Sequence, residues 1–306
     1  MQLKEKLEED GRRFVENVKY YIARYGFENI YNSDQSGFQL EFHSGRSLAI
    51  QGTKKVECMA QSISATTHSY TIQPTISGDG RLLSPLFIVL KELTGTFGPR
   101  VQEVMFKENN IFVLASKSGK LTSHHFEIWL REVYFPNVGP KSVLLLDSWT
   151  GHCPNVIARN KPESAQDAVF LTIPAGTTGQ RQPLDVYGFR LWKNFVKYFS
   201  DIVLLLDLDI KLHSRDAILK LQSLTHYQFS SPRFRNLFKY AWYKSGYIEQ
   251  KPKQFETPVD FCFKNNAKPT CDICGGIAII TCAWCKKSLC IQHFFHDHHM
   301  CNNFEP

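Results

Sequence analysis

The chain has 306 residues, of which 43% are hydrophobic, and Lys plus Arg outnumber Asp plus Glu by 36 to 29. This length and composition predict one large domain with a small appendage and exclude a disordered chain. Aliphatic runs are too short and too acidic to cross a bilayer, and the charged N-terminus lacks the apolar stretch of a secretory signal. We therefore expect an intracellular protein, whose net charge of +7 is compatible with a polyanionic partner.

The first third of the chain predicts a helix followed by strands. Apolar residues at helical spacing predict an amphipathic helix over 3–24. The segment FENIYNSDQSGFQLEF, residues 27–42, alternates with a period of two and predicts a strand. Residues 67–92 predict two strands that are joined by the turn Gly78-Asp79-Gly80, in which Asp79 is expected to be a turn residue only.

Strands and helices alternate in the remainder, which predicts a mixed α/β sheet flanked by helices. We expect a helix at 123–136, strands at 143–147 and 168–174, and helices at 185–201, 214–225 and 231–247. A dinucleotide-binding fold is not expected, because no G-x-G-x-x-G follows a strand. The predicted organisation is an N-terminal helix (1–27), a main domain (28–250), a linker (251–268) and a small zinc-binding domain (269–304).

Three aspartates occur at the ends of predicted elements. Asp34 lies in the first strand, Asp147 ends the run VLLL, and Asp185 begins a helix. Capping is the simple alternative for Asp147 and Asp185, since Asp is among the best N-cap residues. Taken together, the three carboxylates could instead converge on Mg²⁺ or Mn²⁺. Two such ions would activate a water and stabilise the leaving oxygen in phosphodiester cleavage.

Four motifs around these aspartates indicate a family. NSDQSGF, ISGDGRLLSPLFIVLKE, VLLLDSWTGH and LTIPAGTTGQRQPLDVYGF, in this order, resemble the DDE-superfamily endonuclease domain of pogo, Tigger and jerky-type transposases over residues 28–250. Asp34, Asp147 and Asp185 match the three acidic positions of that family, and His152 matches the histidine after the second. Gln35 and Ser148-Trp149 depart from the usual pattern without removing a predicted ligand. The resemblance implies a ribonuclease-H-like fold and a nuclease that uses two metal ions to nick DNA and join ends.

Basic residues near these motifs are candidates for contacts with DNA phosphates, although each could equally belong to a solvated surface. The candidates are Lys54, Lys55, Arg181, Arg190 and Lys193.

The last part of the chain predicts a module that binds two zinc ions. Six of the nine cysteines fall between residues 271 and 301, with the spacing C-x2-C-x7-C-x2-C-x4-C-x2-H-x4-H-x2-C. Such clustering in a reducing compartment favours metal over disulfides. Eight ligands suit two tetrahedral zinc ions, and the close spacing predicts a cross-brace. The expected sets are Cys271, Cys274, Cys290 and His293 on one ion, and Cys282, Cys285, His298 and Cys301 on the other.

Either His296 or His299 could replace His298 in the second set. The spacing also resembles the C-terminal cysteine-rich domain of piggyBac-type transposases, which recognises transposon-end DNA. The same pattern occurs in RING domains and B-boxes, so both DNA and protein are possible partners, and DNA is favoured.

The sequence thus predicts a nuclear transposase or transposase-derived endonuclease with an Asp-Asp-Asp triad, DNA as its partner and possible self-association. One alternative is a domesticated, non-catalytic DNA-binding or chromatin factor, and another is a zinc-module adaptor or ubiquitin ligase. Barely thirty residues precede the first strand, too few for the helix-turn-helix module of pogo-like transposases. Either the chain is part of a longer protein or its tail recognises DNA.

Overall fold

The computed structural model describes residues 2–40, 61, 69–266 and 268–305. Its first eight strands form two four-stranded sheets of order β4-β1-β7-β8 and β2-β3-β5-β6, and β9 and β10 in the tail form a two-stranded sheet. Only Asp34-Gln35 separates β1 from β2, and only Pro74 separates β3 from β4, so two interrupted strands join the sheets. The strands of these two four-stranded sheets are β1 (Ile30–Ser33), β2 (Ser36–Gln39), β3 (Ser69–Gln73), β4 (Thr75–Ser77), β5 (Leu86–Lys91), β6 (Ile111–Ser116), β7 (Val143–Leu146) and β8 (Val169–Thr172).

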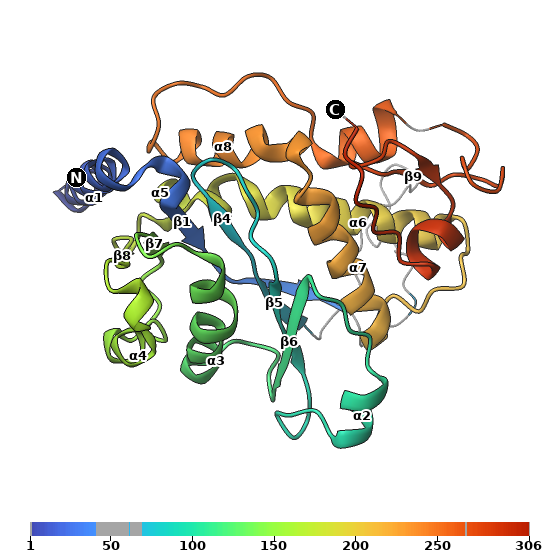
Figure 1. Ribbon diagram of the computed structural model, residues 1–306, viewed down its shortest axis with the longest axis horizontal. Coiled ribbons are helices and arrows are strands. Elements are labelled where there is room, and N and C mark those ends of the chain that lie inside the picture. Colours follow the sequence, from blue (N-terminus) through green and yellow to red (C-terminus); the bar gives the residue numbers. More distant parts are fainter. Residues whose placement is uncertain (1, 41–60, 62–68, 267, 306) are drawn as a thin grey trace, which may run out of the picture.

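Strand directions are mixed. β1 runs parallel to β7, β7 to β8 and β5 to β6, whereas β1–β4, β2–β3 and β3–β5 are antiparallel. With helices on both faces (Figure 1), this arrangement confirms the predicted mixed α/β sheet flanked by helices. The helices are α1 (Gln2–Tyr25), α2 (Pro99–Val104), α3 (Ser123–Trp129), α4 (Pro154–Asn160), α5 (Thr178–Arg181), α6 (Phe189–Leu205), α7 (Arg215–Phe229) and α8 (Arg235–Lys244).

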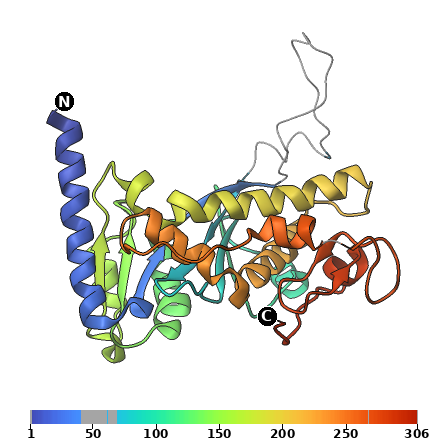
Figure 2. The same cartoon turned by 90° about the horizontal axis from the view of Figure 1, so that it is seen from above.

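Alternation along the strands divides the apolar residues between two cores. Val143 and Leu145 join the core beneath α1, α6, α7 and α8, whereas Leu144 and Leu146 join the one beneath α3 and α4. Because β7 is covered on both faces, it is apolar throughout, as its sequence suggests. Figure 2 shows α1 at one end of the molecule and the Cys/His tail at the other.

The strand predicted over 27–42 is not continuous. Pairing stops at Asp34 and Gln35, and β1 and β2 then pair with different halves of the interrupted β3–β4 strand. Pro74 interrupts the second strand because proline has no backbone N–H to donate to a ladder. Strand β6 and helices α2 and α4 were not predicted, although the run IFVLA carries the β-branched and aromatic residues that favour strands.

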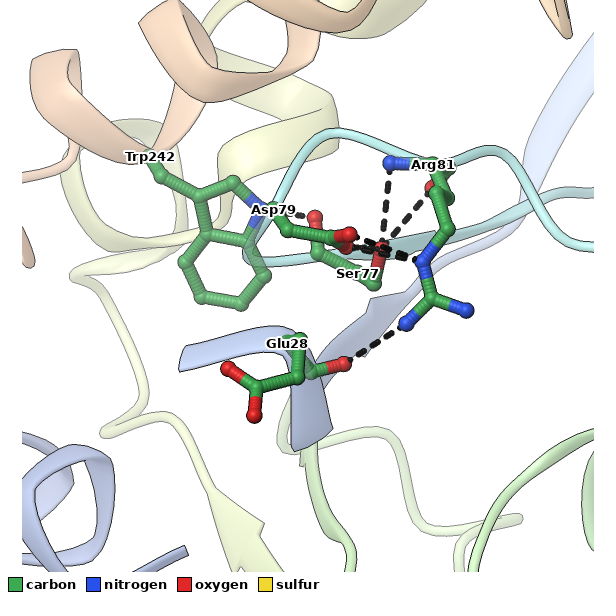
Figure 3. A network of polar contacts seen from close by, with 5 residues as sticks. All are labelled: Glu28, Ser77, Asp79, Arg81 and Trp242. Atoms are coloured by element: carbon green, nitrogen blue, oxygen red, sulfur yellow. Dashed lines mark hydrogen bonds and ion pairs between the residues drawn. The ribbon is translucent and has the colours of Figure 1, made fainter. Parts of the chain in front are cut away.

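The turn at 78–80 is confirmed, and Asp79 serves it structurally (Figure 3). The carboxylate of Asp79 accepts a hydrogen bond from Ser77 and forms an ion pair with Arg81 at 2.9 Å. Arg81 also donates to the Glu28 carbonyl at 3.0 Å, and the Trp242 indole donates to the Ser77 carbonyl at 3.0 Å. The turn is therefore tied to the residues before β1 and to α8.

The segment predicted as a linker is partly folded. Asp260–Asn265 form a short π-helix, in which Phe261, Cys262 and Phe263 are buried in the core beneath α6 and α7. Burial of such apolar side chains contributes about 1.5–3 kcal/mol each, which fixes the segment in place.

The tail that follows packs against α6 and α7. It contains β9 (Ile280–Thr281), β10 (Ser288–Leu289) and a short π-helix, Gln292–His296. The Trp284 indole donates to the Tyr227 carbonyl at 2.8 Å, and Phe295 packs against Phe199. The tail thus shares the core of the main domain. Among the described residues, no helix is long and apolar enough to span a membrane.

Candidate active site and metal centres

Two of the three predicted aspartates lie side by side at one edge of the sheet. β1 and β7 are parallel, and Asn32 is paired with Leu145. Asp34 and Asp147 each come two residues after that pair, immediately beyond the carboxyl ends of their strands. This is the edge at which open α/β sheets place ligand chemistry.

Asp185 joins them from a different element. It lies on a short π-helix, Leu184–Gly188, which leads into α6. The carboxyls of Asp34 and Asp147 are both close enough to shift the pKa of Asp185. Asp185 does not form an N-cap hydrogen bond, because the N-cap position is Pro183. The structure therefore brings all three predicted aspartates together.

Amide side chains hold these elements in place, and sequence reasoning did not identify them. The fully buried Asn32 donates to the Leu145 carbonyl at 3.1 Å and accepts from the Leu184 N–H at 3.1 Å. Gln182, also fully buried, donates to the Ser33 carbonyl at 3.3 Å and lowers the pKa of the neighbouring Asp34 carboxyl. The signal that could have indicated Asn32 is a polar residue inside a strand, two positions before Asp34. A buried polar side chain nearly always has a hydrogen-bond partner.

The carboxylates perturb one another strongly. Burial, followed by the charges of Asp185 and Asp147, raises the pKa of Asp34 well above its usual range. Burial also raises the pKa of Asp185, against the opposing effects of the neighbouring Asp34 and the charge of Lys193. Like charges gathered in a partly desolvated site favour protonation or a bound cation.

Asp147 differs because it has a histidine partner. Burial alone would raise its pKa, but His152 Nδ1, 2.9 Å from the carboxylate, and the Trp149 N–H lower it overall. The His152 side chain is only 4% exposed and packs against the rings of Phe126 and Trp149. Asp147 is therefore the member of the triad that stays ionised most readily.

The residues predicted to contact DNA lie in four different environments. Lys193 is half-buried beside Asp185, and its ammonium group lies 5.4 Å from the centre of the Phe38 ring.

Arg181 donates to the Ser245 carbonyl at 3.1 Å and packs against Gly11 of α1, so its guanidinium serves the fold. Arg190 is exposed and lines a cavity of 560 Å³ between α6 and residues 257–264. Lys54 and Lys55 lie outside the described residues.

The tail brings together two sets of four zinc-type ligands. In each set, the candidate ligand atoms all lie within 4.8 Å of one another. Among the described residues, the carboxylates of Asp34, Asp147 and Asp185 are spaced more widely than this. The first set is Cys271, Cys274, Cys290 and His293, as predicted, and the second is Cys282, Cys285, His299 and Cys301. The pairs interleave along the chain, in the order expected for a cross-brace.

His299 therefore takes the place predicted for His298, and that prediction is corrected. The backbone of His298 is left-handed, with a φ of 52°, and its side chain is directed elsewhere. Its Nε2 lies 3.0 Å from the Ser223 hydroxyl and its Nδ1 lies 3.4 Å from Glu108. His299 Nε2 instead lies 3.4 Å from Cys285 Sγ.

The spacing of these sulfurs fits zinc. The Sγ atoms of Cys274 and Cys290 are 3.7 Å apart, and those of Cys282 and Cys301 are 3.8 Å apart. A tetrahedral site with Zn–S bonds of about 2.3 Å has sulfur–sulfur edges of about 3.8 Å. No disulfide links these cysteines, which are free thiols.

Two family models match the chain. The DDE superfamily endonuclease matches residues 75–229, just over half of the sequence, and includes Asp147 and Asp185 but not Asp34. The Tc5 transposase C-terminal domain matches residues 242–301, which contain most of the tail. The tail thus matches a Tc5 domain, where its spacing had suggested a piggyBac-type one. The chain belongs to the DDE superfamily endonuclease family.

Solved structures of the Mos1 transposase are similar to this chain at a low level. A Mos1 paired-end complex with left transposon end is 10% identical over 82% of this chain and 64% of the other, with a TM-score of 0.39. The Mos1 catalytic domain with raltegravir and Mg is 10% identical over 80% of this chain and 98% of the other, with a TM-score of 0.33. This chain spans less than two thirds of the Mos1 chain in the paired-end complex. No curated protein matches it.

Proposed function

We propose that this protein is a transposase or transposase-derived endonuclease that cleaves DNA phosphodiester bonds at Asp34, Asp147 and Asp185. The observation that carries this proposal is the meeting of three carboxylates, two beyond parallel strand ends and one on η6 (Leu184–Gly188). A partly buried cluster of carboxylates is a costly arrangement without cations, because each charge disfavours the others. Membership of the DDE superfamily endonuclease family supports the same activity.

The oxygen-rich donor set suits Mg²⁺ or Mn²⁺, with Asp34, Asp147 and Asp185 as the protein ligands. Gln182 supports this fit, since its buried Oε1 has no hydrogen-bond partner among the described residues and its carboxamide already contacts Asp34. When bound, two such ions would activate the attacking water and stabilise the leaving oxygen.

The protein's own groups prepare this site. His152 holds Asp147 in one orientation and keeps it ionised. Asp34 must lose the proton that its raised pKa favours, so ligand binding there is expected to release a proton. Lys193 places a positive charge next to Asp185, where it would also attract a DNA phosphate.

The tail would hold two structural zinc ions, with His299 in place of His298. Because it packs on α7, these ions would stabilise the main domain as well as the tail. We infer that DNA is the partner of both parts and that the protein acts in the nucleus. Self-association, expected from the sequence, stays a prediction.

The test is cleavage of supercoiled plasmid, linear DNA and transposon-end DNA by the purified chain with Mg²⁺ or Mn²⁺. Asp34→Asn, Asp147→Asn and Asp185→Asn should each abolish nicking, and Ca²⁺ should support DNA binding without cleavage. Asp167→Asn is the matched control, since Asp167 is exposed and remote from the three carboxylates in the fold. A wild-type protein that binds these DNAs but cleaves none of them with either metal would be a non-catalytic DNA-binding factor instead.

A further inference from the structure

Among the strands that the structure describes, β6 is an edge strand with one side open. It is the last strand in the order β2-β3-β5-β6 and is paired in parallel with β5 along its other side. The Asn110 carbonyl accepts from the Leu86 N–H at 2.8 Å, and the Ser116 carbonyl accepts from the Glu92 N–H at 2.9 Å. Even-numbered residues therefore direct their backbone groups towards β5, and Val113 and Ala115 direct theirs away from it.

One group on the open side is already occupied. His125 Nδ1 lies 3.2 Å from the Thr122 backbone N–H, which can only donate, so this nitrogen is the acceptor. The proton is then on Nε2, which donates to the Ala115 carbonyl at 3.0 Å. Across the described chain, the Val113 N–H and carbonyl and the Ala115 N–H have no hydrogen-bond partner. An open edge of this kind is a template for another strand.

A trough of 580 Å³ runs along this edge. Residues 113–116 of the strand and Lys117 after it line this trough, together with residues 95–97 and 102–107 on one side and α3 on the other. Figure 1 shows β6 between α2 and α3. The lining includes Phe97, Met105 and Ile128, which are apolar enough to favour peptide side chains over a nucleic-acid backbone.

Charge defines the kind of peptide that fits. The lining includes Lys107 and Lys117 and contains no Asp or Glu. Complementary charge therefore calls for acidic side chains on the occupant.

We propose that this trough is a docking site for an extended, acidic segment of a partner protein, which adds as a strand to β6. Backbone hydrogen bonds to Val113 and Ala115 would supply affinity, and alternate side chains would enter the apolar lining. Because the Ala115 carbonyl already accepts a hydrogen bond from His125, a docked strand can pair with the Ala115 N–H but not with this carbonyl. This interaction is separate from DNA cleavage and does not depend on it.

The test uses three synthetic nine-residue peptides with alternating valine and threonine, flanked by glutamate, glutamine or lysine. Fluorescence anisotropy with the full 306-residue chain should give the tightest binding for the glutamate-flanked peptide, by roughly tenfold over the lysine-flanked one. Hydrogen exchange of the Val113 and Ala115 amides should slow when this peptide is bound. Equal affinity for all three peptides, or unchanged exchange at both amides, would overturn the proposal.

Val113→Pro gives the sharpest variant. Its N–H faces away from β5, so proline removes a docking donor while the β5 ladder stays intact, as edge strands tolerate. Peptide affinity should fall by about tenfold or more, because a peptide carbonyl is left unpaired. Unfolding by heat should remain close to that of the wild type.

A second variant covers the case in which proline disturbs the fold. Lys107→Glu with Lys117→Glu should reverse the peptide preference, towards the lysine-flanked sequence. Lys120→Glu with Lys141→Glu is the matched control, since both lysines are exposed and neither lines the trough. Equal effects of the two double variants would show only a general charge effect. Displacement of the peptide by a DNA oligonucleotide would identify the trough as a nucleic-acid surface instead.

Discussion

The Asn32 carboxamide oxygen accepts a hydrogen bond at 3.1 Å from the backbone N–H of Leu184, the residue before Asp185. The nitrogen of the same carboxamide donates to the Leu145 carbonyl, two residues before Asp147. One buried side chain on β1 thus connects β7 with the helix that carries the third aspartate. The relative positions of the three carboxylates depend on this connection.

Asn32→Leu should therefore damage both stability and cleavage. It leaves the Leu184 N–H buried without a partner, at a cost of about 1–3 kcal/mol, and removes the side-chain hydrogen bond to the Leu145 carbonyl. Urea unfolding should show this loss, and nicking should fall further than the unfolded fraction explains, because Asp185 is no longer held. Asn137→Ala is a control, since Asn137 makes a similar bond to the Val133 carbonyl away from the triad. An Asn32→Leu protein that is fully active would show that Asn32 does not position the site.

Asp34→Asn should stabilise the Mg²⁺-free protein at neutral pH. The pKa of Asp34 is raised in the folded state above its ordinary value of 3.8. The protonated Asp34 carboxyl contributes its full stability to the fold below pH 3.8, and this contribution is lost as pH rises through the folded-state pKa. The loss is about 1.4 kcal/mol for each unit by which folding raises the pKa. The gain in unfolding free energy from Asn should therefore be present at pH 7 and vanish towards pH 3.8.

Urea titrations of both proteins over this pH range measure that difference in unfolding free energy. Because both proteins carry the same Cys/His tail, its own pH dependence cancels when the two are compared. Added Mg²⁺ should then stabilise the wild type but not the variant, since only the wild type keeps all three ligands. A variant less stable than the wild type at pH 7 would mean that Asp34 is a structural carboxylate whose hydrogen bonds outweigh its burial.

His152→Ala should shift the pH dependence of cleavage. His152 lowers the pKa of Asp147 by hydrogen bonding and charge, and burial would raise it in the absence of His152. The acid limb of the nicking rate should therefore move to higher pH. Stability contributed by Asp147, which is present above its unfolded pKa and lost as pH falls through its lowered folded pKa, should decrease at neutral pH. His124→Ala, at a side chain that is 75% exposed, should leave the pH profile unchanged. If the acid limb of the nicking rate stays at the same pH in His152→Ala, His152 does not set the pKa of Asp147.

Two adjacent histidines test the zinc assignment. His299→Ala should lower the zinc content from about two ions per chain towards one, because a tetrahedral site loses a ligand. His298→Ala should keep both ions and lose only its contacts with Ser223 and Glu108. Zinc analysis by mass spectrometry after dialysis distinguishes them, and the reverse result would restore His298 as the ligand. Loss of zinc should also lower the unfolding temperature of the main domain, because the tail packs on α7.

The sequence by itself determined the features that depend on local pattern. A four-residue apolar run predicted the buried strand before Asp147, and ligand pairs two to four residues apart predicted how the cysteines are grouped, because such pairs can face only one ion. The family motifs indicated which aspartates to compare.

Tertiary structure alone decided the features that depend on partners distant in sequence. His298 and His299 are equivalent in the sequence, and the choice between them followed from the left-handed backbone at His298 and the positions of Ser223 and Glu108. Asn32 resembles any other strand residue until Leu145 and Leu184 surround it. The open side of β6 likewise exists only because no described strand pairs with it beyond β5. A side chain's role is fixed by the groups that desolvate it and bond to it, and the fold brings those groups from distant parts of the chain.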